Sequence, residues 1–135
     1  HDPCINPGTE IDNTTAIMSA MWIPQVKIIG HPDNPRFPVD FDKIAKAAKE
    51  RHVLLECNNS SYRPGGSRSG SRDLAKKMLQ ACKKYGTHVI MGSDAHIDLD
   101  VGNHALSEEV ICEADFPEEL VINSSPEKFK EWIRA

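Results

Sequence analysis

The chain has 135 residues, 39% of them hydrophobic, and a formal net charge of −4, which suits one globular domain or part of one. The acidic balance argues against a general nucleic-acid-binding protein, which would need a basic face. No run of 18 apolar residues is present that could cross a membrane. No signal peptide is visible, so we expect a cytoplasmic protein.

Helix and strand signals alternate along the chain. Short apolar runs between turn residues predict strands at 26–29, 53–57, 88–91 and 120–122. Apolar residues at helical spacing predict helices between Thr9 and Pro24, from Asp40 to the residues before Val53, over Leu74–Tyr85, around Asn103–Glu113 and from Ser125 through Ile133. Such alternation is typical of an α/β protein with parallel strands and right-handed crossovers. Two architectures stay open, a doubly wound sheet and a (β/α) barrel or part of one.

The stretch Gly92–His96 directly follows a predicted strand and contains Asp94 and His96, two residues apart. In an extended chain these two side chains point to the same side. A carboxylate oxygen and an imidazole nitrogen are ligands that Zn²⁺, Mn²⁺ and Fe²⁺ all accept. The isolated pair is a weak signal, because most Asp-x-His pairs are solvated loop residues.

Two further predicted strands end in polar side chains. His31 follows the first strand, and Glu56, Asn58 and Asn59 stand at the end of the second. The carboxyl ends of parallel strands lie on one rim, which carries the active site of (β/α) barrels and the ligand crevice of open sheets. The sequence therefore predicts a site at this rim.

Other polar and sulfur-containing residues suggest structural roles. His52 and His88 precede strands, so we expect them at the opposite end of the sheet, and His104 near the start of a helix should be solvated. Cys57 and Cys82 fall at apolar positions of a strand and a helix. We expect both to be reduced core cysteines.

A loop rich in Gly and Ser contains Arg63, Arg68 and Arg72 and leads into a helix. The amino end of a helix favours an anion, so one interpretation of this loop is a phosphate contact. The other interpretation is a solvated loop with no ligand. The sequence leaves the two open.

Three segments, in this order, resemble the PHP family, named for polymerase and histidinol phosphatase. They are Ile28–Pro35, Leu55–Ser61 and Gly92–His96. The chain is most similar to the stand-alone phosphatase branch of this family, and the similarity extends to Asp115–Pro117 and to the Ser-Pro before the last helix. The resemblance implies βα units of a distorted seven-stranded (β/α) barrel. It also implies two or three divalent metal ions, usually zinc, manganese or iron, at the carboxyl rim.

The resemblance also implies roles for individual residues. Metal ligation is implied for His31, Asp94 and His96, and for His1, which stands 30 residues before His31. His1 and His31 would share one metal, while Asp94 and His96 would serve the neighbouring ones and take part in catalysis. The substrate contacts that we predict are Asn58, Asn59 and Arg63.

Part of the family pattern is missing. Its His-x-His motif, the next histidine and a bridging glutamate are absent, so residues 1–135 resemble the C-terminal half of the fold, a single partial domain. The predicted strands cannot close a seven-stranded barrel and would expose an apolar sheet edge. We therefore expect association with a missing N-terminal portion or with a second copy.

The predicted function is metal-dependent phosphoester hydrolysis, in which a metal-bound hydroxide attacks a small phosphomonoester. As an isolated fragment the chain is expected to be inactive. Three alternatives remain. One is a catalytically incomplete PHP-like module with a binding or structural role, and another is a doubly wound binding domain with chance histidines. The third is a polymerase-associated PHP exonuclease domain, against which the acidic charge weighs.

Overall fold

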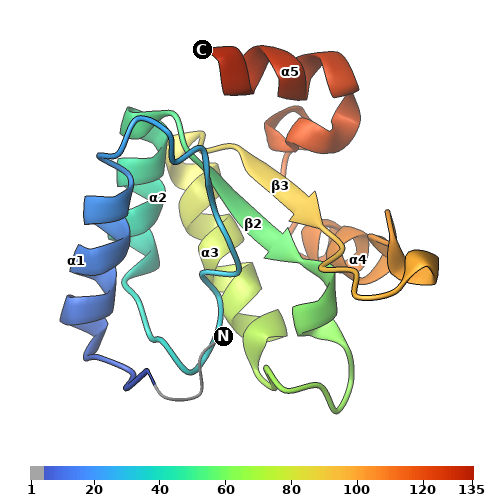
Figure 1. Cartoon of the computed structure of the whole chain (residues 1–135), viewed down its shortest axis with the longest axis horizontal. Helices are drawn as coiled ribbons and strands as arrows, with labels where there is room; N and C mark the ends of the chain where they lie inside the picture. Colours follow the sequence, from blue (N-terminus) through green and yellow to red (C-terminus); the bar gives the residue numbers. More distant parts are fainter. Residues whose placement is uncertain (1–4) are drawn as a thin grey trace.

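The computed structural model describes residues 5–135 and shows a mixed α/β fold with a three-stranded parallel sheet in the order β1-β2-β3 (Figure 1). The strands are β1 (Ile28–Ile29), β2 (Leu54–Asn58) and β3 (Val89–Gly92). The α-helices of the described residues are α1 (Glu10–Ala20), α2 (Phe41–Arg51), α3 (Ser71–Tyr85), α4 (Ala105–Glu113) and α5 (Pro126–Arg134). Short 3₁₀ turns are η1 (Asn59–Tyr62), η2 (Asp98–Asp100), η3 (Glu118–Leu120) and η4 (Ile122–Ser124).

The helix ends follow local chemistry. Thr9 accepts a hydrogen bond from the Asp12 N–H and forms a capping box at the start of α1. The Asp40 side chain caps α2, and the Ser125 side chain caps α5. Helix α3 ends at Gly86, whose φ of 67° is readily adopted by glycine. The predicted helices are thus confirmed.

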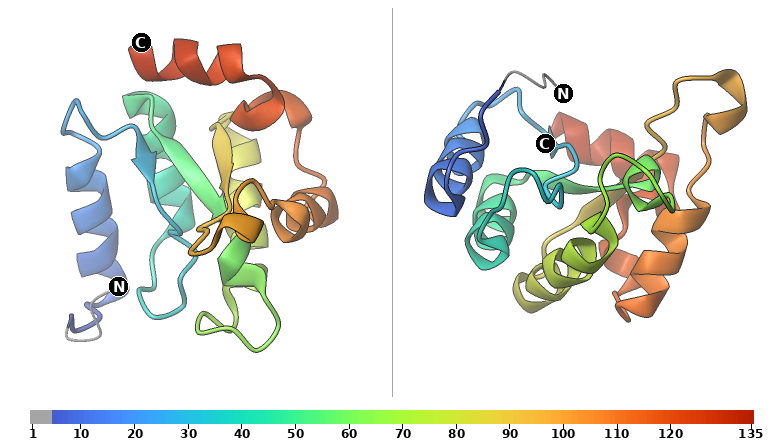
Figure 2. Two further views of the ribbon diagram at one scale, coloured as in Figure 1. Left: turned by 45° about the vertical axis from the view of Figure 1, so that its right-hand side comes forward. Right: turned by 90° about the horizontal axis from the view of Figure 1, so that it is seen from below.

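Helices α1 to α4 pack as successive neighbours along one side of the sheet (Figure 2). The strands keep their sequence order, so each crossover returns on the same face. A doubly wound sheet would reverse its strand order and carry helices on both faces. Three parallel strands in sequence order fit both a segment of a barrel and one half of a doubly wound sheet, so both alternatives stay open. The three strands form an open sheet, and the closed barrel stays a prediction.

Side chains of β2 alternate between two faces of the sheet. Leu55 and Cys57 belong to the core beneath the helices, together with Ile44 of α2 and Met78 of α3. Glu56, between them in sequence, points to the helix-free face and is half-buried. The helix-free face therefore receives a carboxylate from the central strand.

The predicted strand at 120–122 is wrong. Two 3₁₀ turns, η3 and η4, occupy this stretch, and a single bridge joins Val121 to Val89. The Asn123 side chain accepts a hydrogen bond from the Met91 N–H at 2.7 Å and donates one to the Met91 carbonyl at 3.0 Å. The Asn123 side chain thus forms hydrogen bonds with backbone groups of β3 that would have paired with a longer fourth strand.

Helix α5 lies at the amino end of the strands and contributes no buried residue. Trp132 stacks on His52 with ring centroids 3.6 Å apart, and the His88 ring lies 4.6 Å from it. His52 and His88 are thus at the end opposite to the rim, as predicted. The prediction that Ile133 faces inward is wrong, since its side chain is 40% exposed.

Replacing Trp132 with alanine is expected to release α5 without unfolding the rest of the chain. The stack is the aromatic contact that holds this helix to the strands, and such contacts contribute about 0.5–1.5 kcal/mol beyond area burial. Hydrogen exchange of the amides of 126–134 should accelerate, while the main unfolding transition changes little. Ile133→Ala is the matched control, and equal exchange in the two variants would contradict the prediction.

The cysteines behave as predicted. Cys57 and Cys82 are buried and unpaired, whereas Cys112 is exposed. Burial raises the pKa of the Cys57 thiol and raises the pKa of Cys82 to about 12, so both are unreactive core thiols. Within residues 5–135, no helix has the length and apolar character needed to span a bilayer.

Candidate active site

The carboxyl ends of the three strands meet at one rim. His31 follows β1, Asn58 ends β2, and Asp94 follows β3. The carboxylate of Asp94 acts on the pKa of His31, so the two side chains lie within electrostatic reach of each other. Residues 63 positions apart in sequence are thus neighbours at the rim.

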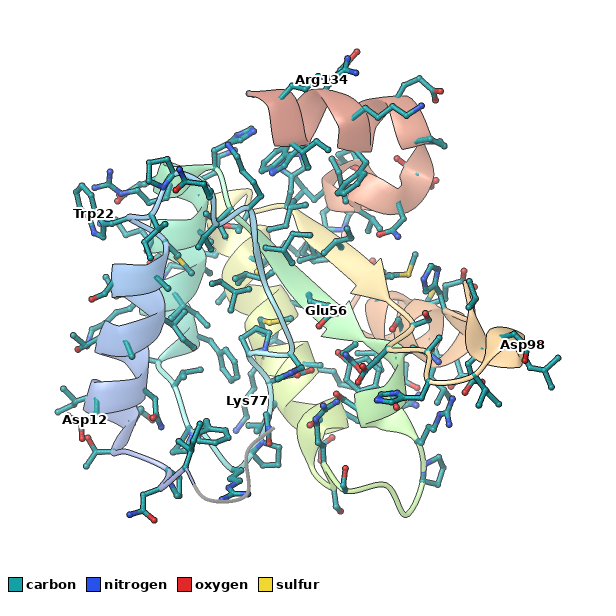
Figure 3. All side chains as sticks on the ribbon, viewed as in Figure 1. Asp12, Trp22, Glu56, Lys77, Asp98 and Arg134 are labelled. Carbon is teal, nitrogen blue, oxygen red and sulfur yellow. The ribbon has the colours of Figure 1, made fainter. Side chains whose placement is uncertain are left out.

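The Glu56 carboxylate lies on the helix-free face between the other two strands (Figure 3). Its Oε2 accepts hydrogen bonds from the His31 N–H at 2.8 Å and from Asn58 Nδ2 at 3.3 Å. A β-carbon on Gly92 would lie 2.0 Å from Glu56 Oε1, and one on Gly30 would lie 3.4 Å from Oε2. Both glycines directly precede rim segments. A glycine at the end of each neighbouring strand is the sequence signal that could have indicated a side chain of β2, Glu56, lying between them.

His31 and Asp94 both have positive φ, 34° and 51° respectively. Asp and His enter this left-handed region more readily than most residues, but at some cost in energy. Such backbone conformations concentrate at functional sites. The chain therefore turns sharply just after β1 and just after β3, at two of the predicted ligands.

Arg68 is the arginine that the structure brings to the rim. Its Nη1 lies 2.9 Å from Ser61 Oγ, 3.3 Å from Asp94 Oδ2 and 3.5 Å from Asn58 Oδ1. The Arg68 side chain is only 11% exposed, whereas Asp94 is 30% exposed. A guanidinium held at this depth places a fixed positive charge beside the predicted ligands.

The other two arginines, Arg63 in the loop and Arg72 in the first turn of α3, pair with carboxylates outside the proposed ligand set. Arg63, the predicted substrate contact, is 44% exposed and pairs with Asp100 at 2.8 Å. Arg72 pairs with Glu109 and Glu113 of α4. Sequence alone could not separate the three, because they share one Gly- and Ser-rich stretch.

His96 has the orientation of a typical metal-binding histidine. Its Nδ1 lies 2.8 Å from the Asp94 carbonyl oxygen. A carbonyl only accepts hydrogen bonds, so Nδ1 donates to it and Nε2 is the ring nitrogen left for a metal ion. A backbone carbonyl bound to the other ring nitrogen is the usual support of a metal-ligating histidine.

The surroundings of His31 favour the neutral form of its imidazole. Burial, followed by the positive charge of Arg68, lowers the pKa of His31. A neutral imidazole is the form that binds a metal ion. The electrostatics at this position therefore suit the predicted role.

The ligand set within the described residues is incomplete. No group of three His, Cys, Asp or Glu side chains in residues 5–135 is arranged to hold a metal ion. His1, the fourth predicted ligand, lies outside the described residues. His31, Asp94 and His96 provide nitrogen and oxygen donors of the right chemistry for zinc, manganese or iron, at the edge of an open sheet.

The two asparagines after β2 have different surroundings. Asn58 accepts a hydrogen bond from the Ser61 N–H at 3.1 Å and lies beside Arg68 at the rim. Asn59 is buried and accepts hydrogen bonds from the N–H groups of Leu106 at 2.9 Å and Ser107 at 3.1 Å. Asn59 thus caps α4 from a distant strand end, a structural role that the sequence did not indicate.

A buried carboxyl group lies behind the rim. Tyr62 donates a hydrogen bond to Asp33 Oδ2 at 2.7 Å, and both residues are buried. Burial raises the pKa of Asp33 to about 7. This pair fixes the loop after His31 to η1, and nothing in the sequence pattern pointed to it.

Replacing Tyr62 with phenylalanine is expected to destabilise the chain by about 1–3 kcal/mol, because a buried carboxyl group loses its hydrogen-bond donor while the ring volume is kept. Urea unfolding monitored by circular dichroism measures the change. Tyr85→Phe is the control, because its hydroxyl bonds to the exposed Asp42. A loss no greater than that of Tyr85→Phe would contradict the prediction.

Known proteins similar to this chain are named as probable phosphatases. No family model matches the chain. It is 45% identical over 135 residues to a probable phosphatase of Clostridium acetobutylicum, 40% over 135 residues to one of Clostridium novyi, and 41% over 134 residues to one of Acetivibrio thermocellus. These matches cover 99–100% of this chain but 54% of each relative. The chain therefore spans about half the length of these curated relatives.

Proposed function

We propose that this chain is part of a metal-dependent phosphatase that hydrolyses a small phosphomonoester. The observation that carries the proposal is the position of Arg68. Its guanidinium is mostly buried and lies 3.3 Å from Asp94, beside His31. A fixed positive charge beside side chains that can bind metal ions suits a substrate that carries a doubly negative phosphate group. It also suits a reaction centre that is polar. The names of the relatives support the same class of reaction.

In this proposal His31, Asp94 and His96 hold the metal ions, with His1 as a further ligand, and Asp94 and His96 form the catalytic centre. The number of ions is two or three, and zinc, manganese and iron all suit these donors. When bound, such ions lower the pKa of water and neutralise charge on the phosphoryl oxygens. The protein contributes two imidazoles and a carboxylate whose orientations are set by the backbone.

The remaining rim residues bind and orient the substrate. The planar guanidinium of Arg68 presents donors that match two phosphate oxygens. Asn58 supports this guanidinium through its side-chain oxygen. Arg63, further out and more exposed, is proposed to contact the part of the substrate beyond the phosphate. Asp94 and Ser61 keep Arg68 at the rim before substrate binds.

A partner is proposed to complete the site. The helix-free face of the sheet exposes Ile28, which is 39% accessible, and the rim lacks a third nearby ligand among residues 5–135. The relatives have nearly twice the length of this chain. The proposed partner is the N-terminal portion of such a protein, or else a second copy of this chain.

One alternative keeps support, namely a catalytically incomplete PHP-like module. The absence of a three-ligand group among residues 5–135 favours it. In that case the rim would serve assembly or ligand binding without hydrolysis. A metal measurement separates the two functions, because an assembly module needs no stoichiometric metal.

The test is elemental analysis of the purified chain after dialysis, for the wild type, Asp94→Ala and His31→Ala. We expect zinc, manganese or iron in the wild type and a loss in both variants. His104→Ala is the control, since this residue is the N-cap of α4 and is not among the predicted ligands. The same substitutions in the full-length Clostridium acetobutylicum relative, assayed with p-nitrophenyl phosphate, complete the test. Absence of stoichiometric metal in both proteins would overturn the proposal.

A further inference from the structure

The Glu56 side chain occupies the space between the segments that carry His31 and Asp94. We propose that Glu56 is a positioning residue, which fixes the backbone of His31 and thereby the direction of its imidazole. This inference rests on the proposed metal-dependent function, in which His31 is a ligand. Glu56 itself touches no predicted substrate contact except Asn58.

The backbone of His31 adopts an unfavourable conformation. Its φ of 34° is left-handed, which is costly for a residue with a β-carbon. The His31 N–H donates to Glu56 Oε2 at 2.8 Å. A hydrogen bond to an ionised acceptor is about twice as strong as one between neutral groups. The Glu56 carboxylate therefore offsets the cost of the turn that carries the imidazole.

The glycines at positions 30 and 92 leave space for the Glu56 carboxylate. A β-carbon at position 92 would lie 2.0 Å from Glu56 Oε1 and 3.0 Å from Glu56 Cδ. A β-carbon at position 30 would meet Oε2 at 3.4 Å, an ordinary contact. The missing side chain of Gly92 therefore lets Glu56 lean toward the rim, which makes the hydrogen bond to His31 possible.

Glu56 is also connected to the other polar residues of the rim. Glu56 Oε2 also accepts a hydrogen bond from Asn58 Nδ2 at 3.3 Å. Asn58 Oδ1 in turn lies 3.5 Å from Arg68 Nη1, which pairs with Asp94. A series of polar contacts thus runs from Glu56 through Asn58 and Arg68 to Asp94. Glu56 is the group that connects His31 to this series.

The first test uses the metal-free chain and heteronuclear NMR. In Glu56→Ala the His31 amide loses its acceptor, so its exchange with solvent should accelerate about tenfold or more, in line with the loss of a hydrogen bond to a charged group. Glu56→Gln keeps a carbonyl acceptor of the same shape and should restore most of the protection. An unchanged His31 amide in Glu56→Ala would overturn the proposal.

A double-mutant cycle tests the Glu56–His31 contact through Gly92, at the end of β3. Gly92→Ala should displace the Glu56 carboxylate and expose the His31 amide, whereas Gly30→Ala should change it little. In the Glu56→Ala background, Gly92→Ala should have almost no further effect on His31, because the clash is gone. Equal effects of Gly92→Ala in both backgrounds would contradict the inference.

A Co²⁺ titration followed by visible absorption links the contact to the proposed metal site. Glu56→Ala should weaken Co²⁺ binding about tenfold or more, as removal of a group that orients a ligand does, and Glu56→Gln should bind nearly as the wild type. If neither the wild type nor the full-length Clostridium acetobutylicum relative binds Co²⁺, the proposed function fails, while the NMR cycle still decides the Glu56–His31 contact. Equal Co²⁺ affinity in Glu56→Ala and wild type would overturn the positioning role.

Discussion

Replacing Arg68 with glutamine should weaken the binding of inorganic phosphate about 10- to 100-fold, because hydrogen bonds to charged groups contribute about 1.5–3 kcal/mol and each 1.4 kcal/mol is a factor of ten. Arg68 is the rim arginine with an 11% exposed side chain. The same substitution removes a positive charge beside Asp94. Binding of Mn²⁺ should therefore stay the same or become tighter while phosphate binding falls.

Isothermal titration of the chain with phosphate and with Mn²⁺ measures both effects. Arg72→Gln is the matched control, because Arg72 lies four residues further along, in the first turn of α3, but pairs with glutamates of α4. It should leave phosphate binding within about twofold of the wild type, as expected for a surface substitution. A loss of phosphate binding that is equal in the two variants would show that the effect is only one of total charge.

Replacing Asn59 with alanine is expected to destabilise the chain by about 2–4 kcal/mol, because two amide groups at the start of α4 lose their acceptor in a buried position. The acceptor is the Asn59 side-chain oxygen, 2.9 Å from the Leu106 N–H and 3.1 Å from the Ser107 N–H. The helix has no side-chain cap from its own N-cap residue, His104. No local group replaces the lost acceptor.

Urea unfolding gives the free energy for this variant and for Asn103→Ala. Asn103 also accepts a hydrogen bond at the start of α4, from the Ala105 N–H at 3.3 Å, but in an exposed position. Its loss should cost well under 1 kcal/mol, because water can replace the acceptor. Equal destabilisation of the two variants would contradict the prediction that the buried Asn59 cap stabilises α4 more than the exposed Asn103 cap.

The helices were predictable because their signals are local. The caps at Thr9, Asp40 and Ser125 lie within one turn of the amide groups that they bind, and Gly86 ends α3 through its own φ. The prediction of a rim had a similar basis. Parallel strands end on one side, so the sequence order of strands and polar residues was enough to place His31 near Asp94.

The two wrong predictions, the strand at 120–122 and the inward-facing Ile133, depend on contacts between residues that are distant in sequence. Asn123 binds the backbone of Met91, 32 residues away, and so replaces a predicted strand by turns. Ile133 is exposed because α5 contacts His52 and His88 through the Trp132 ring instead. Neither outcome has a signal in the local pattern.

At the candidate site, the residue types and their order along the chain were sufficient to predict carboxylate and imidazole donors at a strand-end rim. The choice of Arg68 over Arg63, the capping role of Asn59 and the contact of Glu56 with His31 needed the folded chain. Each depends on a hydrogen bond between segments 10 to 47 residues apart. Such a bond depends on how the segments pack, and the composition of either segment alone does not specify it.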